Sequence, residues 1–285
     1  MSDLNGKVCL VTGATDGHGR AIARQLAKLG AEVVVHGRNA AKCEAVQDEI
    51  SEITGGKRPE ALLCDLSSRE AIDGAAREFL ARGCPLDLLV NNAGMVSLSR
   101  EENAEGHELV LAVNYYAMFQ LTLLLWPRLV ESAPARVINV SSDTYKIGKL
   151  DLDDLAMSRY STSNSYSRSK LAVVYFTMEL ARRTQGSGVT VNAVDPGPVS
   201  SNIASNNPGL LYSIAKPMIK YLFPSADRAA RTAIMLASSP DLAEASGGYY
   251  RSMIHRKNPL SFDADYSERL WAITSEVTGT QLSGR

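Results

Sequence analysis

The residues best placed to do chemistry are a tyrosine and a lysine four positions apart, in Tyr166-Ser-Arg-Ser-Lys170. On a helix, residues at this spacing share a face, so the lysine ammonium can act on the phenol. A phenol has a pKa of about 10, and lowering it to about 7 takes roughly 4 kcal/mol. One lysine at about 4 Å supplies only about 1 kcal/mol in bulk water. The pair therefore predicts a partly dry cleft in which Tyr166 moves a proton, with a solvated helix face as the alternative.

A serine hydroxyl precedes this pair along the chain. Residues 139–142 read Asn-Val-Ser-Ser, and Ser142 follows a strand-like run. A polar connection at 143–165 separates Ser142 from Tyr166. Loops of this length in compact domains are usually functional or disordered. We therefore expect either a lid over a substrate or a flexible linker.

A glycine-rich turn lies near the N-terminus, where residues 12–19 read Thr-Gly-Ala-Thr-Asp-Gly-His-Gly. Its spacing is G-x-x-x-G-x-G, between a strand-like run and a helix-like run. Glycine permits a tight turn and lets backbone N–H groups approach a pyrophosphate, and a helix N-terminus favours negative charge. The stretch predicts a nucleotide phosphate site; a β–α turn without a ligand is the alternative.

The end of the second strand-like run indicates which nucleotide binds. An NAD site places an Asp or Glu about 20 residues after the glycines, where it accepts from the ribose 2′-hydroxyl. Residues 36–39 read His-Gly-Arg-Asn and contain no acid. An acid would repel a 2′-phosphate, whereas Arg38 can bind one through a charge-assisted fork. We therefore expect NADP(H) rather than NAD(H). The alternative is that Arg38 is simply a solvated residue at the start of a helix.

Apolar strand-like runs alternate with helical patterns for most of the chain. Strands are expected at 7–12, 31–37, 60–65, 87–90, 136–140 and 189–194. Helices are expected at 19–30, 39–54, 67–83, 106–126 and 165–183. Short apolar strands separated by helices form parallel βαβ units, which right-handed crossovers wind in both directions. We predict an α/β fold, a Rossmann-type doubly wound parallel sheet of about seven strands with helices on both faces.

No repeat, low-complexity tail or linker divides the chain, so we predict one domain over residues 1–285. Residues 1–140 would form mainly the cofactor-binding half, and residues 141–285 the catalytic and substrate-lid half. Ligands in such sheets bind at the carboxyl ends of the strands. The glycine-rich turn and the motifs that follow the other strands should therefore meet at one edge.

The ordered set of motifs resembles the short-chain dehydrogenase/reductase family over nearly the whole chain. The matching positions are Thr12 to Gly19 (T-G-x-x-x-G-x-G), Asp65-Leu66, Asn91-Asn92-Ala93-Gly94, Asn114, Ser142, Tyr166-x-x-x-Lys170 and Pro196-Gly197. The long gap before Tyr166, the stretch at 147–150 and the ending at 268–279 resemble the retinol dehydrogenase-like branch.

The resemblance implies a role for each matched position. Tyr166 would be the general acid/base on a carbonyl or alcohol oxygen, and Ser142 would hydrogen-bond the same oxygen. Lys170 would tune Tyr166 and bind the nicotinamide ribose, and Asn114 would hold a water that links Lys170 to solvent. Cofactor contacts are implied for Gly13, Thr15, Asp16, Gly17, His18, Gly19, Arg38, Asp65, Leu66, Asn92, Ala93, Gly94, Tyr166, Lys170, Pro196, Gly197, Val199 and Ser201.

His18 departs from the family, which commonly has a small aliphatic residue at this position. We expect a backbone contact with the cofactor and no catalytic role. The chain has four histidines, and the other three, His36, His107 and His255, show no spacing typical of a metal site. No metal is therefore expected.

The substrate side is predicted from residues 198–225, which contain four prolines among leucines, isoleucines, methionine and aromatic residues. Such a segment suits a substrate lid and favours a lipophilic ketone, aldehyde or alcohol. Packing on the core or a second subunit, or peripheral contact with a membrane, are alternatives. We expect an NADP(H)-dependent carbonyl reductase or alcohol dehydrogenase; a non-catalytic nucleotide sensor of this fold and an epimerase or dehydratase are the alternatives.

Composition narrows the remaining classes. The formal net charge is −1, with no basic excess to suggest nucleic acid. The four cysteines form no C-x-x-C pair, which is typical of a reducing compartment. The N-terminus does not read as a signal peptide, and the most apolar stretch, 118–126, is expected to stop at Pro127, too short to span a bilayer. We expect a cytoplasmic protein, with apolar helix faces that would suit a homodimer.

Overall fold

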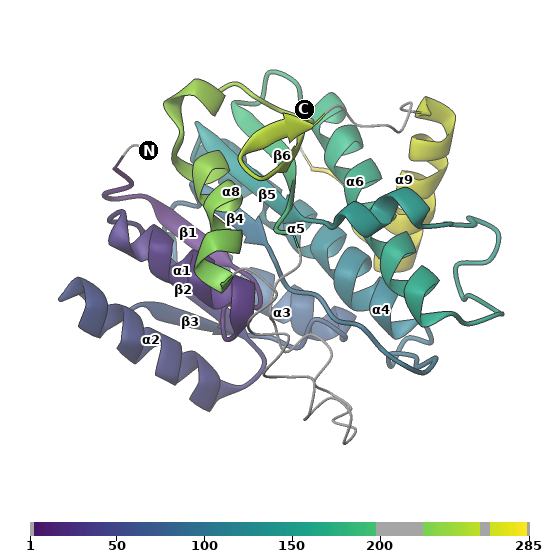
Figure 1. Cartoon of the computed structure of the whole chain (residues 1–285), viewed down its shortest axis with the longest axis horizontal. Coiled ribbons are helices and arrows are strands. Elements are labelled where there is room, and N and C mark those ends of the chain that lie inside the picture. The colour runs from purple at the N-terminus through teal and green to yellow at the C-terminus, as the bar shows by residue number, and fades with distance from the viewer. Residues whose placement is uncertain (1–2, 198–224, 257–262, 284–285) are drawn as a thin grey trace.

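A computed structural model describes residues 3–197, 225–256 and 263–283. Within them, eight strands form one sheet in the order β3-β2-β1-β4-β5-β6-β7-β8, parallel except for β7 with β8. The predicted doubly wound, mainly parallel α/β fold is confirmed (Figure 1). The strands are β1 Val8–Val11, β2 Glu32–Gly37, β3 Glu60–Leu63, β4 Leu88–Asn91, β5 Ala135–Val140, β6 Val189–Asp195, β7 Tyr249–Arg251 and β8 Ile254–Arg256.

Helices cover both faces of the sheet. They are α1 Gly17–Lys28, α2 Ala40–Thr54, α3 Arg69–Ala81, α4 Leu109–Leu111, α5 Ala117–Glu131, α6 Thr162–Arg183, α8 Ala226–Ser238 and α9 Ala264–Thr278, with the short helices η1 Ala112–Tyr116, η2 Asp143–Ile147 and η4 Pro240–Leu242. One buried cluster contains residues of α1, α2 and α8, and the other contains residues of α3, α5, α6 and α9.

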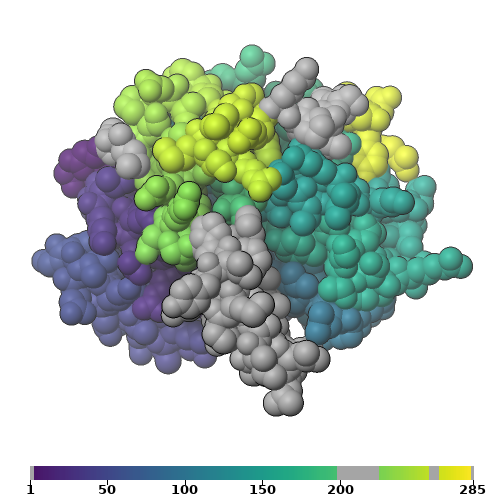
Figure 2. Space-filling model, in the orientation of Figure 1, coloured from purple at the N-terminus to yellow at the C-terminus, as the bar shows by residue number. Residues whose placement is uncertain are grey.

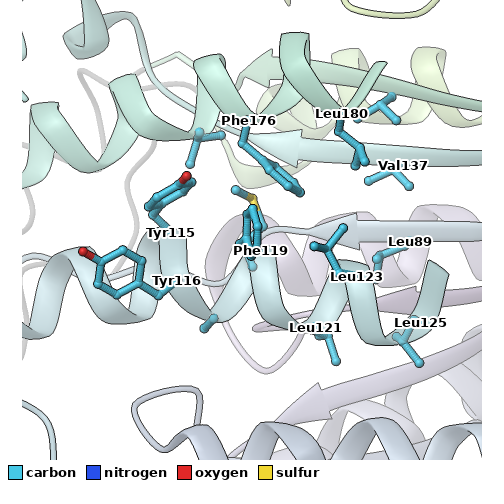
Figure 3. Packing of buried hydrophobic residues seen from close by; sticks show 14 of the residues in the cluster. Leu89, Tyr115, Tyr116, Phe119, Leu121, Leu123, Leu125, Val137, Phe176 and Leu180 are labelled. Carbon is cyan, nitrogen blue, oxygen red and sulfur yellow. The ribbon is translucent and has the colours of Figure 1, made fainter. Parts of the chain in front are cut away.

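The strands read as continuous apolar runs because both of their faces are buried. In β1, Val8 and Leu10 belong to one cluster, whereas Cys9 and Val11 belong to the other. Successive side chains of a strand point to opposite faces, so a sheet covered on both sides needs apolar residues at every position. Figure 3 shows the larger cluster, in which Phe119 of α5 faces Phe176 of α6.

Two strands escaped the sequence pattern. β7 and β8 have three residues each, too few to show the apolar run of a buried strand. β8 is also exposed along its whole length. The hairpin lies on the surface near α8, in yellow-green beside green in Figure 2. β7 matters for the site, because its last residue, Arg251, pairs in register with Asp195 at the end of β6.

The expected helix end at Pro127 is wrong, because α5 continues through this proline to Glu131. Proline removes one backbone hydrogen bond and costs about 3 kcal/mol in a helix interior. Leu129, which follows it, is 0% exposed, and its burial favours continuing the helix. By length and composition the helical stretch Leu109–Glu131 resembles a membrane span, with a mean hydropathy of 1.6, but 83% of its apolar window is buried inside the molecule.

The connection after Ser142 is packed rather than free. It begins with η2, and the backbone carbonyls of the following segment accept hydrogen bonds from three side chains of other elements. Tyr266 donates to Leu150, Arg168 to Leu155 and Arg100 to Ala156. A flexible linker therefore does not describe residues 148–161. Of the predicted substrate lid, residues 198–225, all but Ser225 lie outside the described part of the chain.

Candidate active site

The glycine-rich turn joins β1 to α1 at the edge formed by the strand ends. Gly13 has φ 62° and Gly17 φ 48°, which are left-handed conformations that favour glycine. A Cβ on Gly13 would lie 2.9 Å from the Cα of Ala93, and one on Gly19 would collide with the Gly13 carbonyl. Glycine at these positions therefore lets the turn fold back on itself and pack on the loop after β4. The turn leads into the start of α1, where N–H groups favour a pyrophosphate.

This crowding gives a direct test of the turn. We expect Gly19→Ala to weaken NADPH binding at least about tenfold, because overpacking a rigid contact costs about 1–3 kcal/mol and displaces the phosphate-binding backbone. NADPH fluorescence titration measures the change. The matched control is Gly74→Ala in α3, where a Cβ meets nothing within 4 Å. An affinity unchanged in Gly19→Ala would contradict this placement of the cofactor.

A polar network fixes the turn to the loop that follows β4. The hydroxyl of Thr12 accepts from the backbone N–H groups of Asn92 and Ala93, at 2.9 and 3.0 Å. The Asn92 amide donates to the Thr12 carbonyl at 2.9 Å, and its Oδ1 lies 2.9 Å from Nδ1 of His18. His18 is 8% exposed, and burial lowers its pKa. In the structure His18 thus holds Asn92 in place, a contact that the sequence did not reveal.

His36 is a second buried histidine that supports the turn. The N–H of Gly13 donates to Nδ1 of His36 at 3.2 Å, and burial lowers the pKa of His36 to about 4. Its imidazole is therefore neutral near pH 7 and can accept this hydrogen bond. The sequence analysis did not predict this supporting role for His36.

Basic side chains line the cleft beyond the turn. Arg38 is exposed there, together with Asn39 and with Lys42 in the first turn of α2. Asp65 lies on the same wall. Burial acts to raise the pKa of Asp65, but hydrogen bonds from Ser67 and the charge of Arg38 outweigh it, so the pKa is lowered. Two cations near an opening favour a phosphate at this end of the cleft.

Ser142, Tyr166 and Lys170 line the same cleft, and Ser142, just after the end of β5, lies three strands away from Arg38, just after the end of β2. Tyr166 and Lys170 share a face of α6, with the lysine Nζ 5.6 Å from the centre of the tyrosine ring. Lys170 is 3% exposed and donates to the Val140 carbonyl at 2.9 Å. The spacing thus brings the ammonium close to the phenol, and the solvated helix face is wrong for this pair.

Burial opposes ionisation of both groups. It raises the pKa of Tyr166 to about 12, although a hydrogen bond with Ser142 acts in the opposite direction. It lowers the pKa of Lys170 to about 8, against the effect of Asp195. Lys170 is buried beside the phenol, but burial alone makes the phenol less acidic. Positive charge near Tyr166 has to provide the fall in its pKa that proton abstraction requires.

Asn114 lies in η1, outside the lining of the cleft but against it. Its Oδ1 accepts from the Met95 N–H at 2.7 Å, and its Nδ2 donates to Met95 O and to the Ser169 hydroxyl, both at 3.0 Å. A Cβ on Gly94 would lie 3.3 Å from Asn114 Oδ1 and 3.5 Å from Lys170 Nζ. Asn114 therefore ties the loop after β4 to α6. The predicted water next to Lys170 stays a prediction.

The chain contains Tyr-x-x-x-Lys at two other places. Tyr145, four residues before Lys149, is 1% exposed and packs on Tyr249, with ring centres 5.0 Å apart. It does not line the cleft. The third tyrosine, Tyr212, lies outside the described residues. Among described residues, tertiary position thus selects Tyr166.

One cleft of about 910 Å³ brings most of the predicted site residues together. Val199 and Ser201 lie outside the described residues. The predicted residues that line the cleft are Gly13, Thr15, Asp16, Gly17, His18, Gly19, Arg38, Asp65, Leu66, Asn92, Ala93, Gly94, Ser142, Tyr166, Lys170, Pro196 and Gly197. The volume, the close-approach glycines at one end and the phenol at the other fit an extended dinucleotide together with a small substrate.

Five charged residues of the cleft were missed by the sequence analysis: Lys42, Glu101, Asp143, Asp195 and Arg251. Asp143 directly follows Ser142, and Asp195 directly precedes Pro196, so their places at two strand ends could have drawn attention. Arg251 ends β7, which the sequence pattern does not predict. An arginine beyond an unrecognised strand gives no signal in the sequence.

The fold and the cleft define a class of protein, a nucleotide-dependent oxidoreductase of Rossmann type. Residues 7–208 match the short chain dehydrogenase family. The protein therefore belongs to this family, the NAD(P)-dependent short-chain dehydrogenases/reductases, as the motifs predict.

The retinol dehydrogenase-like resemblance is confirmed by two relatives. The chain is 39% identical over 280 residues to human (Homo sapiens) retinol dehydrogenase 12, covering 97% of this chain and 87% of the relative. It is 39% identical over 284 residues to polyprenol dehydrogenase of Mus musculus, covering 96% and 84%. A short chain dehydrogenase of Shigella flexneri, solved in complex with NADP, superposes with a TM-score of 0.71 and 25% identity over 89% of this chain and 100% of that one.

Proposed function

We propose that the protein interconverts a lipophilic ketone or aldehyde and its alcohol with NADP(H). The observation that carries this proposal is that Ser142, Tyr166 and Lys170 meet at one end of a cleft whose other end holds the glycine-rich turn and Arg38. The groups proposed for proton transfer and for nucleotide binding thus line one continuous space.

In the proposed reaction Tyr166 donates its proton to the carbonyl oxygen during reduction and accepts the alcohol proton during oxidation. Ser142 donates a hydrogen bond to the same oxygen as negative charge develops on it. The nicotinamide nucleotide, when bound, supplies or accepts the hydride. Lys170 favours the ionised form of Tyr166 through its charge, and its place beside Gly94 suits a contact with the nicotinamide ribose.

The substrate class is supported by the relatives and by part of the cleft. The relatives are named for retinol and polyprenol, both lipophilic alcohols. Apolar side chains of Met95, Leu109 and Val113 line the cleft. We propose that these side chains contact the apolar part of the substrate.

Arg38 gives a prediction for cofactor choice. Arg38→Ala should raise the KM for NADPH about 10–100-fold and leave that for NADH within about twofold. The reason is that a hydrogen bond to a charged group contributes about 1.5–3 kcal/mol, and only NADPH carries the 2′-phosphate. Steady-state kinetics with both cofactors provide the measurement. Arg58→Ala, at an exposed arginine paired with Asp48 and outside the cleft, is the control. Equal losses for both cofactors would disprove the assignment.

The proposed activity is tested with purified protein, NADPH and a panel of retinaldehyde, a polyprenal and an open-chain sugar aldehyde. We expect oxidation of NADPH with the two lipophilic aldehydes, measured as the loss of NADPH absorbance. Tight NADPH binding without turnover of any aldehyde would instead favour the non-catalytic nucleotide sensor. Product formation without net oxidation of NADPH would favour an epimerase or dehydratase.

A further inference from the structure

Four charged side chains form a network beside the reacting pair, and three of them, Asp143, Asp195 and Arg251, line the cleft. Arg251 Nε lies 3.2 Å from Asp195 Oδ2, and Arg251 also pairs with Asp143. Lys146 donates to Asp143 Oδ2 at 2.9 Å. The two negative charges of the network are thus matched by two positive charges. The set joins the ends of β6 and β7 to η2, the short helix that follows Ser142.

Asp195 is the buried member of this network. It is 3% exposed, and its Oδ1 accepts from the Gly197 N–H at 2.8 Å. Burial raises its pKa, whereas this hydrogen bond and the charge of Arg251 act to lower it. Burial disfavours the ionised form of a carboxylate, and hydrogen-bond donors and nearby cations favour it. The structure gives it Arg251 as its pairing cation.

The charge of Asp195 also reaches the reacting pair. It acts to raise the pKa values of both Tyr166 and Lys170. The charged and titratable side chains that interact electrostatically with Asp195 come from η2, β7 and α6; they are Asp143, Tyr145, Tyr249, Arg251, Tyr166 and Lys170. Lys146 contacts Asp143, and His18 of α1 interacts electrostatically with Lys170. Arg251 neutralises the acid that most directly opposes proton loss from the pair.

We propose that Arg251 is a positioning residue that acts through Asp195, setting the pH at which the Tyr166–Lys170 pair gives up its proton. The inference rests on the proposed function, in which Tyr166 carries the transferred proton. It assigns a role in the reaction to β7, a strand that has no part in the nucleotide motifs. Because the two members titrate together, the prediction concerns the apparent pKa values of the pair.

The test compares the pH profile of kcat/KM for oxidation of retinol by NADP+ in a set of variants. Arg251→Met removes the cation that screens Asp195, while the carboxylate still accepts from the Gly197 N–H. The rising limb should therefore move up by about one pH unit, roughly a tenfold loss at pH 7. Asp195→Asn removes the negative charge, so the limb should move down. The double variant should return towards the wild type, and Arg251→Lys should remain close to it. Arg256→Met, at an exposed arginine of β8, is the control.

A second measurement needs no turnover. In protein labelled with ¹³C-lysine, the NMR titration of Lys170, assigned with Lys170→Arg, should move in the same directions in the same variants. Unmoved profiles and titrations in Arg251→Met, or a shift that persists in the double variant, would overturn the inference. If Tyr166→Phe were fully active, the proposed function would fail, whereas the Lys170 titration would still decide whether Arg251 and Asp195 act on the pair.

Discussion

Replacing Tyr166 by phenylalanine is expected to lower kcat/KM for a lipophilic aldehyde by about 10²–10⁴-fold, the usual contribution of general acid catalysis. The substitution removes one hydroxyl and leaves the ring in place between Ser142 and Lys170. NADPH affinity should change by about twofold or less, because phosphate binding depends on the glycine-rich turn at the other end of the cleft. Single-turnover kinetics and NADPH fluorescence separate the two effects.

Tyr160→Phe is the matched control for this substitution. Tyr160 also carries a hydroxyl with one hydrogen bond, donated to the Ser97 carbonyl at 2.7 Å, but it does not line the cleft. It should keep activity within about twofold. Wild-type activity in Tyr166→Phe would show that another group transfers the proton.

The pH dependence of the wild type follows from the same residue. Reduction requires the protonated phenol and oxidation the ionised one, so reduction should fall and oxidation should rise as pH passes the apparent pKa of the pair. Burial raises the pKa of Tyr166 to about 12, so positive charge from Lys170 has to bring the midpoint down. In Lys170→Met, oxidation should therefore be lost over the whole measurable pH range, not shifted to lower pH.

The largest effect on stability is expected at Arg168, inside the Tyr-x-x-x-Lys motif. Arg168 and Glu108 are 1% and 1% exposed and form an ion pair of 3.1 Å. Glu108 also accepts from two backbone N–H groups and from the Ser165 hydroxyl. Arg168→Met leaves this buried carboxylate without its cation, which should lower the free energy of unfolding by about 3–5 kcal/mol. Urea unfolding followed by circular dichroism measures the change.

Two further variants separate charge from packing. Arg159→Met removes an exposed arginine from the connection that precedes α6 and should change the free energy of unfolding by about 0.5 kcal/mol or less. The double variant Arg168→Met, Glu108→Leu removes both charges and should recover part of the loss, because no unpaired charge stays buried. A single variant as stable as the wild type would mean that the pair contributes nothing to folding.

Arg168 also shows why the connection after Ser142 is ordered. Its guanidinium donates to the Leu155 carbonyl at 3.0 Å and to that of Asp154 at 3.4 Å. The polar sequence of 143–165 predicts a lid or a linker. In the structure, however, its backbone carbonyls accept from side chains of α6, α9 and the loop after β4. Such partners are far away in sequence, and local composition cannot reveal them.

The sequence by itself predicted six of the eight described strands, the glycine-rich turn and the order of the site residues. Strand runs such as 189–194 are continuous and apolar because both faces of the sheet are covered, which is a local signal of a global arrangement. The end of the strand run at 136–140 then indicated the place of Ser142, since parallel strands share their carboxyl edge. Tyr166 and Lys170 were predicted from their four-residue spacing on a helix.

Only the tertiary structure decided which groups act on one another. Tyr166 and Tyr145 have the same spacing to a lysine, and only burial and position against the cleft distinguish them. Arg251 meets Asp195 because β7 pairs with β6, a contact between residues far apart in the chain. Charges interact according to distance and burial, which the fold sets, so their pairing and their effect on proton transfer could not be derived from the order of residues.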